Sequence, residues 1–113
     1  MDVVVERCAG FDVHKDTVVV CVRMPDPLGA RSSEVRTFGT MTEDLLVLRD
    51  WLLALGVTLV GMESTGVYWR PIFYILEDTV ECWLLNARHL RNVPGHKTDQ
   101  LTELLHQTAQ LSA

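Results

Sequence analysis

The sequence lacks several features that would assign it to a specialised class of protein. Its three cysteines, Cys8, Cys21 and Cys82, are an odd number without CxxC spacing. Because all three lie in apolar, strand-like surroundings, we expect them to pack as small hydrophobic residues, not to bind zinc or form disulfides. No apolar run approaches the ~20 residues of a membrane span, and the N-terminus lacks the basic start and long apolar region of a signal peptide. These absences predict a cytoplasmic protein without a membrane partner.

A surplus of basic residues is also missing. The net charge of -5 argues against a general nucleic-acid binder, because phosphate contacts need Lys and Arg. Residues 86–97 are an exception, since they carry several basic side chains and no acid. A basic stripe in an acidic chain is compatible with a metal-dependent nucleic-acid enzyme or with a plain solvated loop. The candidate nucleic-acid contacts in it are Arg88, Arg91, His96 and Lys97, and Lys15 and Arg70 are further candidates for binding phosphate.

The length and composition indicate one folded domain over residues 1–113. A hydrophobic fraction of 48% and a charged fraction of 22% are typical of globular chains. Val-rich runs separated by turn residues predict strands, and leucines at helical spacing predict helices. The expected strands are 3–12, 16–24, 34–38, 57–62 and 80–85, and the expected helices are 42–56, 68–77 and 99–111. This order predicts a mixed α/β sheet covered by helices.

Two polar segments predict how helices begin. Thr42 precedes two acids and a run of leucines, so we expect it to be the N-cap of its helix. Ser64 and Thr65 precede the next predicted helix, and capping is the favoured interpretation of both. In that helix Pro71 is compatible only with the first turn.

Three acids come at element ends. Asp12 ends the first predicted strand, Glu63 follows a buried apolar strand, and Asp99 begins the last helix. In α/β sheets, sites form outside the carboxyl ends of strands, and gathered carboxylates favour a hard cation such as Mg²⁺. The spacing leaves open the alternative that each acid only ends a strand or caps a helix.

Three sequence blocks together resemble a known family. "GFDVHKDTVVVCV", "MESTGVYWRPIFYILE" and "NARHLRNVPGHKTD" are similar to successive blocks of the DEDD transposases. These are bacterial insertion-sequence recombinases whose N-terminal domain resembles the RuvC Holliday-junction resolvase. The similarity covers roughly residues 9 to 100.

The resemblance implies a fold, a metal and partners. The implied fold is ribonuclease-H-like, with an antiparallel meander followed by parallel strands and helices on both faces. Asp12, Glu63 and Asp99 match the first three catalytic acids, which in the family bind Mg²⁺, with Mn²⁺ as a substitute. The implied activity is transposition and recombination of DNA. The implied partners are DNA, a structured guide RNA as an additional candidate, and further copies of the chain.

The chain departs from the family pattern after Leu101. The fourth acid is expected at position 102, where this chain has Thr102. Glu103 is the candidate substitute ligand, although its side chain leaves the helix about 100° away from that of Thr102. Full family members continue into a serine-bearing domain, so we expect this chain to be a fragment without that domain and without full activity alone.

Two alternatives remain open beside a metal-dependent transposase domain. One is a catalytically inactive remnant that keeps nucleic-acid binding or oligomerisation, which Thr102 favours. The other is an actin-like or sugar-kinase ATPase, whose first strand also carries an Asp before a hairpin. Those proteins place a glycine-rich phosphate loop after that Asp, whereas His14 and Lys15 occupy this turn.

Overall fold

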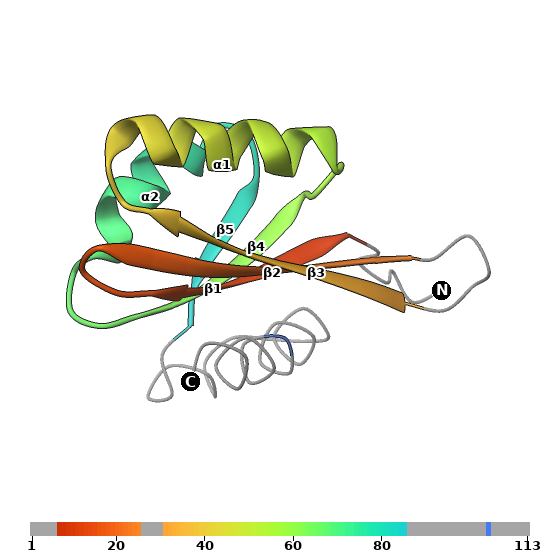
Figure 1. The fold of residues 1–113 in the computed structure, drawn as a ribbon, viewed down its shortest axis with the longest axis horizontal. Helices are drawn as coiled ribbons and strands as arrows, with labels where there is room; N and C mark the ends of the chain where they lie inside the picture. The colour runs from red at the N-terminus through yellow and green to blue at the C-terminus, as the bar shows by residue number, and fades with distance from the viewer. Residues whose placement is uncertain (1–6, 26–30, 86–103, 105–113) are drawn as a thin grey trace.

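The structure is a five-stranded sheet with two helices packed on one face. The computed structural model describes residues 7–25, 31–85 and 104 (Figure 1). The elements in chain order are β1 (Cys8–Val13), β2 (Thr17–Pro25), β3 (Arg31–Gly39), α1 (Thr42–Ala54), β4 (Leu59–Ser64), α2 (Trp69–Leu76) and β5 (Glu81–Leu84).

The strand order is β3-β2-β1-β4-β5. β1, β2 and β3 form an antiparallel meander, whereas β4 and β5 run parallel to β1. The connections through α1 and α2 are the crossovers that parallel strands require. This mixed arrangement confirms the ribonuclease-H-like α/β fold expected from the sequence. No helix among the described residues is long and apolar enough to span a membrane.

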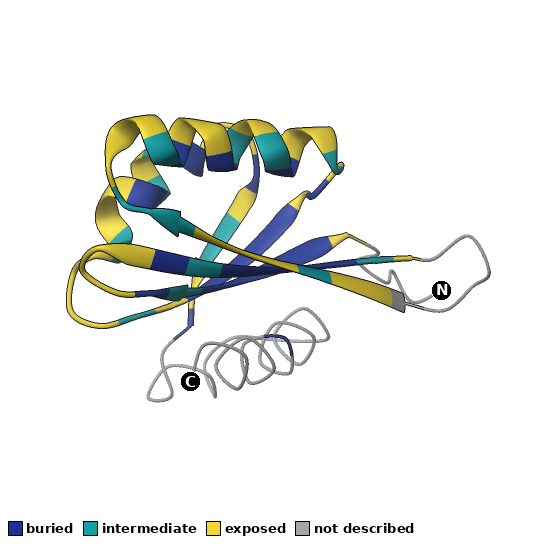
Figure 2. Ribbon diagram, viewed as in Figure 1, coloured by how far each residue is buried: buried dark blue, intermediate teal, exposed yellow. Residues whose placement is uncertain are grey.

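The sheet has two different faces, which the alternation along β1 separates. Ala9, Phe11 and Val13 belong to the core beneath α1 and α2, and all three are fully buried. Cys8, Gly10 and Asp12 alternate with them and lie on the opposite face, called here the second face. Figure 2 shows the burial concentrated on β1, β2 and β4 and on the sides of the helices that face the sheet.

Leu104 is the one described residue of the C-terminal segment, and it is helical and fully buried. It packs in a cluster with Cys8, Cys21, Leu59 and Leu85. Cys8 and Leu59 are register partners on β1 and β4, so this cluster lies on the second face. The rest of the helix expected over residues 99–111 lies outside the described residues.

Helix α1 is held by a leucine stripe, as its spacing predicts. Leu45, Leu48 and Leu52 are at most 1% exposed. The helix begins one residue earlier than the capping pattern predicts: Met41 is the N-cap, and no side chain bonds to the end of the helix. The prediction that Thr42 caps the helix was therefore wrong. Glu43 and Asp44 lie in the first turn, where the helix dipole favours acids.

Helix α2 begins at Trp69, so Pro71 is its third residue and costs no hydrogen bond within the helix. Its N-cap is Tyr68, which makes no side-chain cap bond. The prediction that Ser64 and Thr65 cap this helix was wrong, because a turn separates them from it. Ser64 and Thr65 instead form hydrogen bonds at the ends of β1 and β4.

The three cysteines form no disulfide, and Cys8 and Cys21 are buried. Burial raises the pKa of the Cys82 thiol to about 11, and the nearby Glu77 carboxylate adds to this shift. Cys82 therefore stays protonated at neutral pH, where a protonated thiol is a poor nucleophile and metal ligand. The structural role predicted for the cysteines is consistent with this environment.

The end of α1 depends on a glycine. Gly56 has a φ of 73°, and its N–H donates to the carbonyl of Leu53 while that of Val57 donates to Leu52. These two backbone hydrogen bonds together form a Schellman motif. Val57 and Leu52 both lie in the core beneath the helices, so the motif turns the chain directly into β4.

We predict that Gly56→Ala lowers the free energy of unfolding by about 1 to 2 kcal/mol, because a Cβ is strained in the left-handed region. Gly56→Asn is the matched control and is expected to cost less, since Asn tolerates this region. Urea denaturation of both variants measures the difference. Equal stability of the Ala variant and the wild type would contradict the assigned role of Gly56.

Candidate functional site

Two of the three predicted acids are neighbours in the sheet. β1 and β4 are parallel, and Asp12 is the register partner of Glu63. Register partners on adjacent strands point to the same face, and the strands lie about 4.8 Å apart. Both side chains therefore leave the second face side by side, near the carboxyl ends of their strands. We had expected Glu63 to follow its strand, whereas β4 continues through Ser64.

Two glycines precede the acids on the second face of β1 and β4. Gly10 and Gly61 are also register partners, and each precedes its acid by two positions. Both are buried. Glycines in strands allow another backbone or a ligand to approach the sheet closely. On the second face this glycine pair thus separates the two carboxylates from the apolar cluster that contains Cys8 and Leu59.

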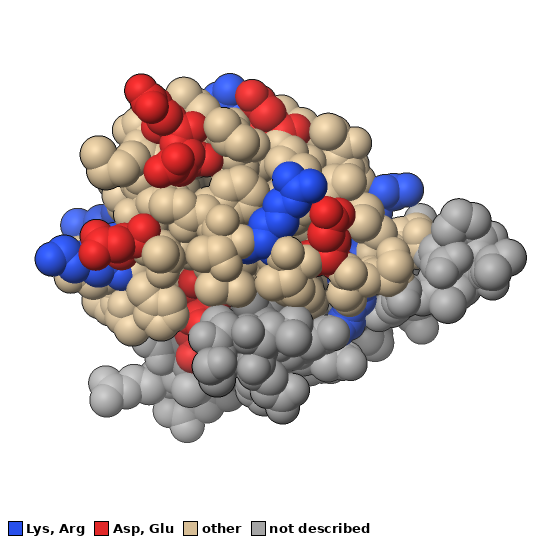
Figure 3. Space-filling model, viewed as in Figure 1, with Lys and Arg blue, Asp and Glu red and all other residues tan. Residues whose placement is uncertain are grey.

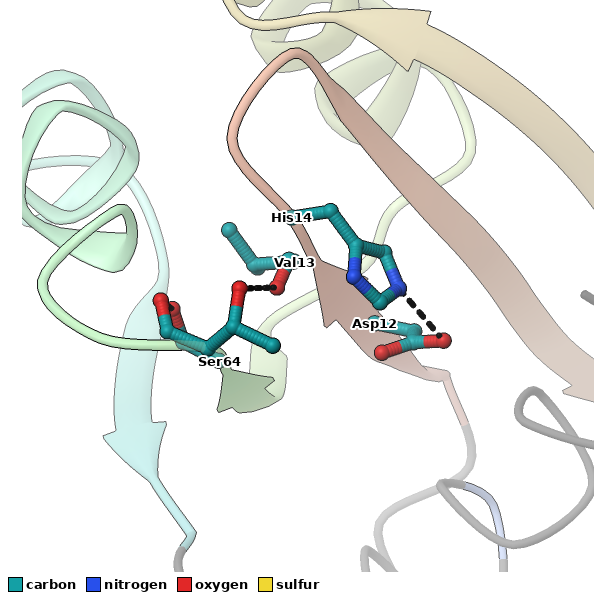
Figure 4. A network of polar contacts seen from close by, with 5 residues as sticks. Asp12, Val13, His14 and Ser64 are labelled. Atoms are coloured by element: carbon teal, nitrogen blue, oxygen red, sulfur yellow. Dashed lines mark hydrogen bonds and ion pairs between the residues drawn. The ribbon is translucent and has the colours of Figure 1, made fainter.

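Hydrogen bonds hold the ends of β1 and β4 together. The N–H of Thr65 donates to the carbonyl of Val13 over 3.1 Å, and the Thr65 hydroxyl approaches the same carbonyl at 3.5 Å (Figure 4). Ser64 Oγ donates to the Thr65 carbonyl over 3.0 Å. These bonds extend the parallel pairing one step beyond Asp12 and Glu63, so the backbones carrying the two acids are held in register.

His14, which the sequence analysis placed in a turn, is also a member of the site. Its Nε2 lies 3.2 Å from Oδ2 of Asp12 (Figure 4). His14 also stabilises the turn, because its backbone N–H donates to the carbonyl of Thr17 over 2.9 Å. The contact holds the imidazole ring beside one oxygen of the Asp12 carboxylate. The sequence signal was the spacing: residues two apart in an extended segment point to the same face.

The surroundings of the acids suit a cation but complete only part of a metal site. The side chain of Asp12 is 20% exposed and Glu63 is exposed, so the pair opens to solvent. Two adjacent carboxylates repel each other unless a hard cation is shared between them. Within residues 7–25, 31–85 and 104, no group of three or more His, Cys, Asp or Glu is arranged to hold a metal ion. The described residues therefore offer two neighbouring carboxylates and no complete ligand set for a cation.

The other predicted site residues are dispersed or undescribed. Lys15 is exposed in the β1–β2 turn, where its carbonyl accepts a bond from the Thr40 hydroxyl. Arg70 is exposed on α2, and its guanidinium lies 5.8 Å from the ring of Trp69. The residues that lie outside the described part of the chain are Asp99, Glu103, Arg88, Arg91, His96 and Lys97.

Charges of both signs are mixed on the face of the described residues that Figure 3 draws. On the face in Figure 3, Lys and Arg are interspersed with Asp and Glu, and the coloured side chains form no continuous basic patch.

A ribonuclease-H-like sheet with paired acids at the ends of β1 and β4 is the framework of a large class of nucleic-acid-processing domains. Comparison with protein families defines this chain further. The model of the DEDD transposase family of the IS110 type, described as a transposase, matches residues 9–102. The chain belongs to this family. The matched range includes Asp12, Glu63 and position 99.

Other comparisons are less informative. No curated protein sequence matches the chain. A solved Aquifex aeolicus member of the Ppx/GppA family is similar at a TM-score of 0.46 and 12% identity, covering 75% of this chain and 36% of that one. A second structure, of an Aquifex aeolicus PPX-GPPA enzyme, is similar at a TM-score of 0.43 and 15% sequence identity, covering 70% of this chain and 36% of that one. The chain spans about a third of the length of these structures, and such low scores carry no argument about activity.

We predict that Glu63→Gln stabilises the metal-free chain by a few tenths to about 1 kcal/mol, because like charges on directly opposite strand positions are destabilising. Glu43→Gln is the control, since it removes the same charge from the first turn of α1, where the dipole favours it. Thermal unfolding in the presence of a chelator measures both. A loss of stability in Glu63→Gln would contradict the adjacency of the two carboxylates.

Proposed function

We propose that this chain is the metal-binding catalytic domain of a DNA transposase, in which Asp12 and Glu63 hold Mg²⁺, with Mn²⁺ as a substitute. One observation carries the proposal: the parallel register that sets the two carboxylates side by side on the second face. The family supplies the reaction class, which is phosphoryl transfer on DNA in transposition and recombination.

Each residue of the pair has a distinct task. Asp12 is the more enclosed acid and lies against His14, so it offers the more restricted ligand oxygen. Glu63 is more exposed, and its longer side chain can adjust to the bound phosphate. A cation held between them activates a nucleophile and neutralises charge on the phosphate. The glycine pair next to the acids leaves room for the incoming backbone of a nucleic acid or of the protein itself.

The remaining ligands in this proposal are Asp99 and Glu103. Leu104 is buried on the second face, the face that carries Asp12 and Glu63, and Asp99 precedes Leu104 by only five positions. This supports Asp99 as the third ligand. Because position 102 is Thr, Glu103 is the proposed replacement for the fourth acid.

The proposed partners follow from the charge distribution and the family. DNA is bound through the basic stripe, with contacts from Arg88, Arg91, His96 and Lys97 and additional phosphate contacts from Lys15 and Arg70. A structured guide RNA is a further partner, and the domain works in the cytoplasm as part of a homo-oligomer. Full recombination in this proposal requires the serine-bearing domain of the family in addition to residues 1–113.

A second candidate function is binding without catalysis. Thr102 favours it, because the fourth acid of the family pattern is missing at that position. In that case the acids would keep their places in the sheet but hold no ion. The two candidates differ in metal affinity, which can be measured directly.

We predict that Mg²⁺ and Mn²⁺ bind to the wild-type chain and that Asp12→Asn and Glu63→Gln each weaken binding at least about tenfold, as loss of a charged ligand implies. Isothermal titration calorimetry provides the measurement. Both substitutions keep the shape of the side chain, so the fold is retained.

Asp78→Asn is the matched control, because it neutralises an exposed acid between α2 and β5, away from the pair. It should bind metal as the wild type does. No binding by the wild type, or binding that both site variants leave unchanged, would refute the metal site and favour the inactive remnant.

A further inference from the structure

The outer edge of β3 is a long strand edge without a partner among the described residues. β3 spans nine residues, Arg31–Gly39, and forms one margin of the sheet. Its inner edge is paired with β2 along its full length. Such an edge presents free backbone donors and acceptors to any strand that can align with it. Natural proteins usually shorten, bulge or cover such edges, and β3 is not short.

The side chains of β3 form a self-complementary pattern. Glu34 and Arg36 lie on the helix-covered face, where their side chains contact at 3.3 Å and are 42% and 53% exposed. Val35 lies between them on the second face and is 39% exposed. On either side of this triplet, Ser33 and Thr37 carry hydroxyl groups. The pattern is symmetric in character about Val35.

We infer that β3 pairs antiparallel with β3 of a second copy of this chain. The two-fold axis is normal to the sheet and passes through the Val35 pair, midway between the two residues. This register sets Val35 opposite Val35 of the second copy, Glu34 opposite Arg36, and Ser33 opposite Thr37. Apolar, oppositely charged and hydroxyl pairs are the favourable cross-strand combinations. The two strands then form one continuous sheet.

Neighbouring symmetric registers are less favourable. An axis through Glu34 sets two carboxylates opposite each other, and an axis through Arg36 does the same for two guanidinium groups. Both also shorten the paired segment. The axis through Val35 is the one that uses all nine residues, because Arg31 then pairs with Gly39.

The adjoining helix supports the same interface. Arg36 stacks at 4.7 Å on the ring of Trp51 in α1, which also contacts Phe38. The guanidinium is thus held above the strand, where it can reach a carboxylate across the axis. Val47 lies one turn before Trp51 on α1 and is 59% exposed, so an apolar side chain beside this edge remains available for a second copy to cover.

Sedimentation equilibrium of the 113-residue chain tests the interface. The wild type is expected to show a concentration-dependent mass rising to twice 12.8 kDa. Arg36→Glu and Glu34→Arg each set like charges across the axis twice, so each is expected to raise the dimer dissociation constant by about tenfold or more. Arg49→Glu is the control, since it makes the same charge change on α1 and should leave the dimer unchanged.

Mixing the two single variants gives the sharpest result. In a heterodimer of Arg36→Glu and Glu34→Arg, opposite charges again face each other at both positions, so the mixture should dimerise more tightly than either variant alone. The exchanged variant Glu34→Arg/Arg36→Glu should also dimerise. A monomeric wild type, single variants that dimerise as tightly as the wild type, or a mixture that dimerises no more tightly than the single variants would each overturn the interface.

Discussion

The parallel pairing of β1 with β4 is the constraint on which the candidate site depends. It sets Asp12 beside Glu63 and Gly10 beside Gly61, and the bonds from Thr65 to the carbonyl of Val13 fix its last step. A slip of one residue would turn Glu63 to the opposite face and place a carboxylate in the core beneath α1 and α2. Burial of the core and exposure of the two acids therefore require the same register. A one-residue slip would disrupt both the core and the acid pair.

Much of this arrangement could be read from the residues. The Val-rich runs predicted the strands, the leucine stripe predicted α1, and the three sequence blocks predicted the family and its fold. The sequence could not supply the register between strands, because many alignments bury equivalent apolar side chains. It also missed His14 as the partner of Asp12, since its turn role is equally compatible with the sequence. Thr42 failed as a cap because Met41 adopts the extended conformation first, and local patterns do not determine which of two adjacent residues does so.

The ends of the central strands and the β3 edge of the sheet have separate tasks in this account. The acid pair lies at the carboxyl ends of the central strands β1 and β4, whereas β3 is two strands away from β1. Pairing through β3 therefore leaves the acids uncovered. A two-fold axis normal to the sheet keeps both second faces on the same side of the extended sheet, so both carboxylate pairs would open in the same direction. This geometry suits a substrate long enough to contact two copies.

The central claim is that Asp12 and Glu63 share one cation. A crystal structure of the chain grown with Mn²⁺, with anomalous diffraction locating the ion, tests this claim most directly. The account predicts an anomalous peak on the second face at the ends of β1 and β4, within about 2.0 to 2.3 Å of a carboxylate oxygen from each acid, the distance typical of small divalent cations. A peak bound elsewhere, or a peak held by only one of the two acids, would contradict it.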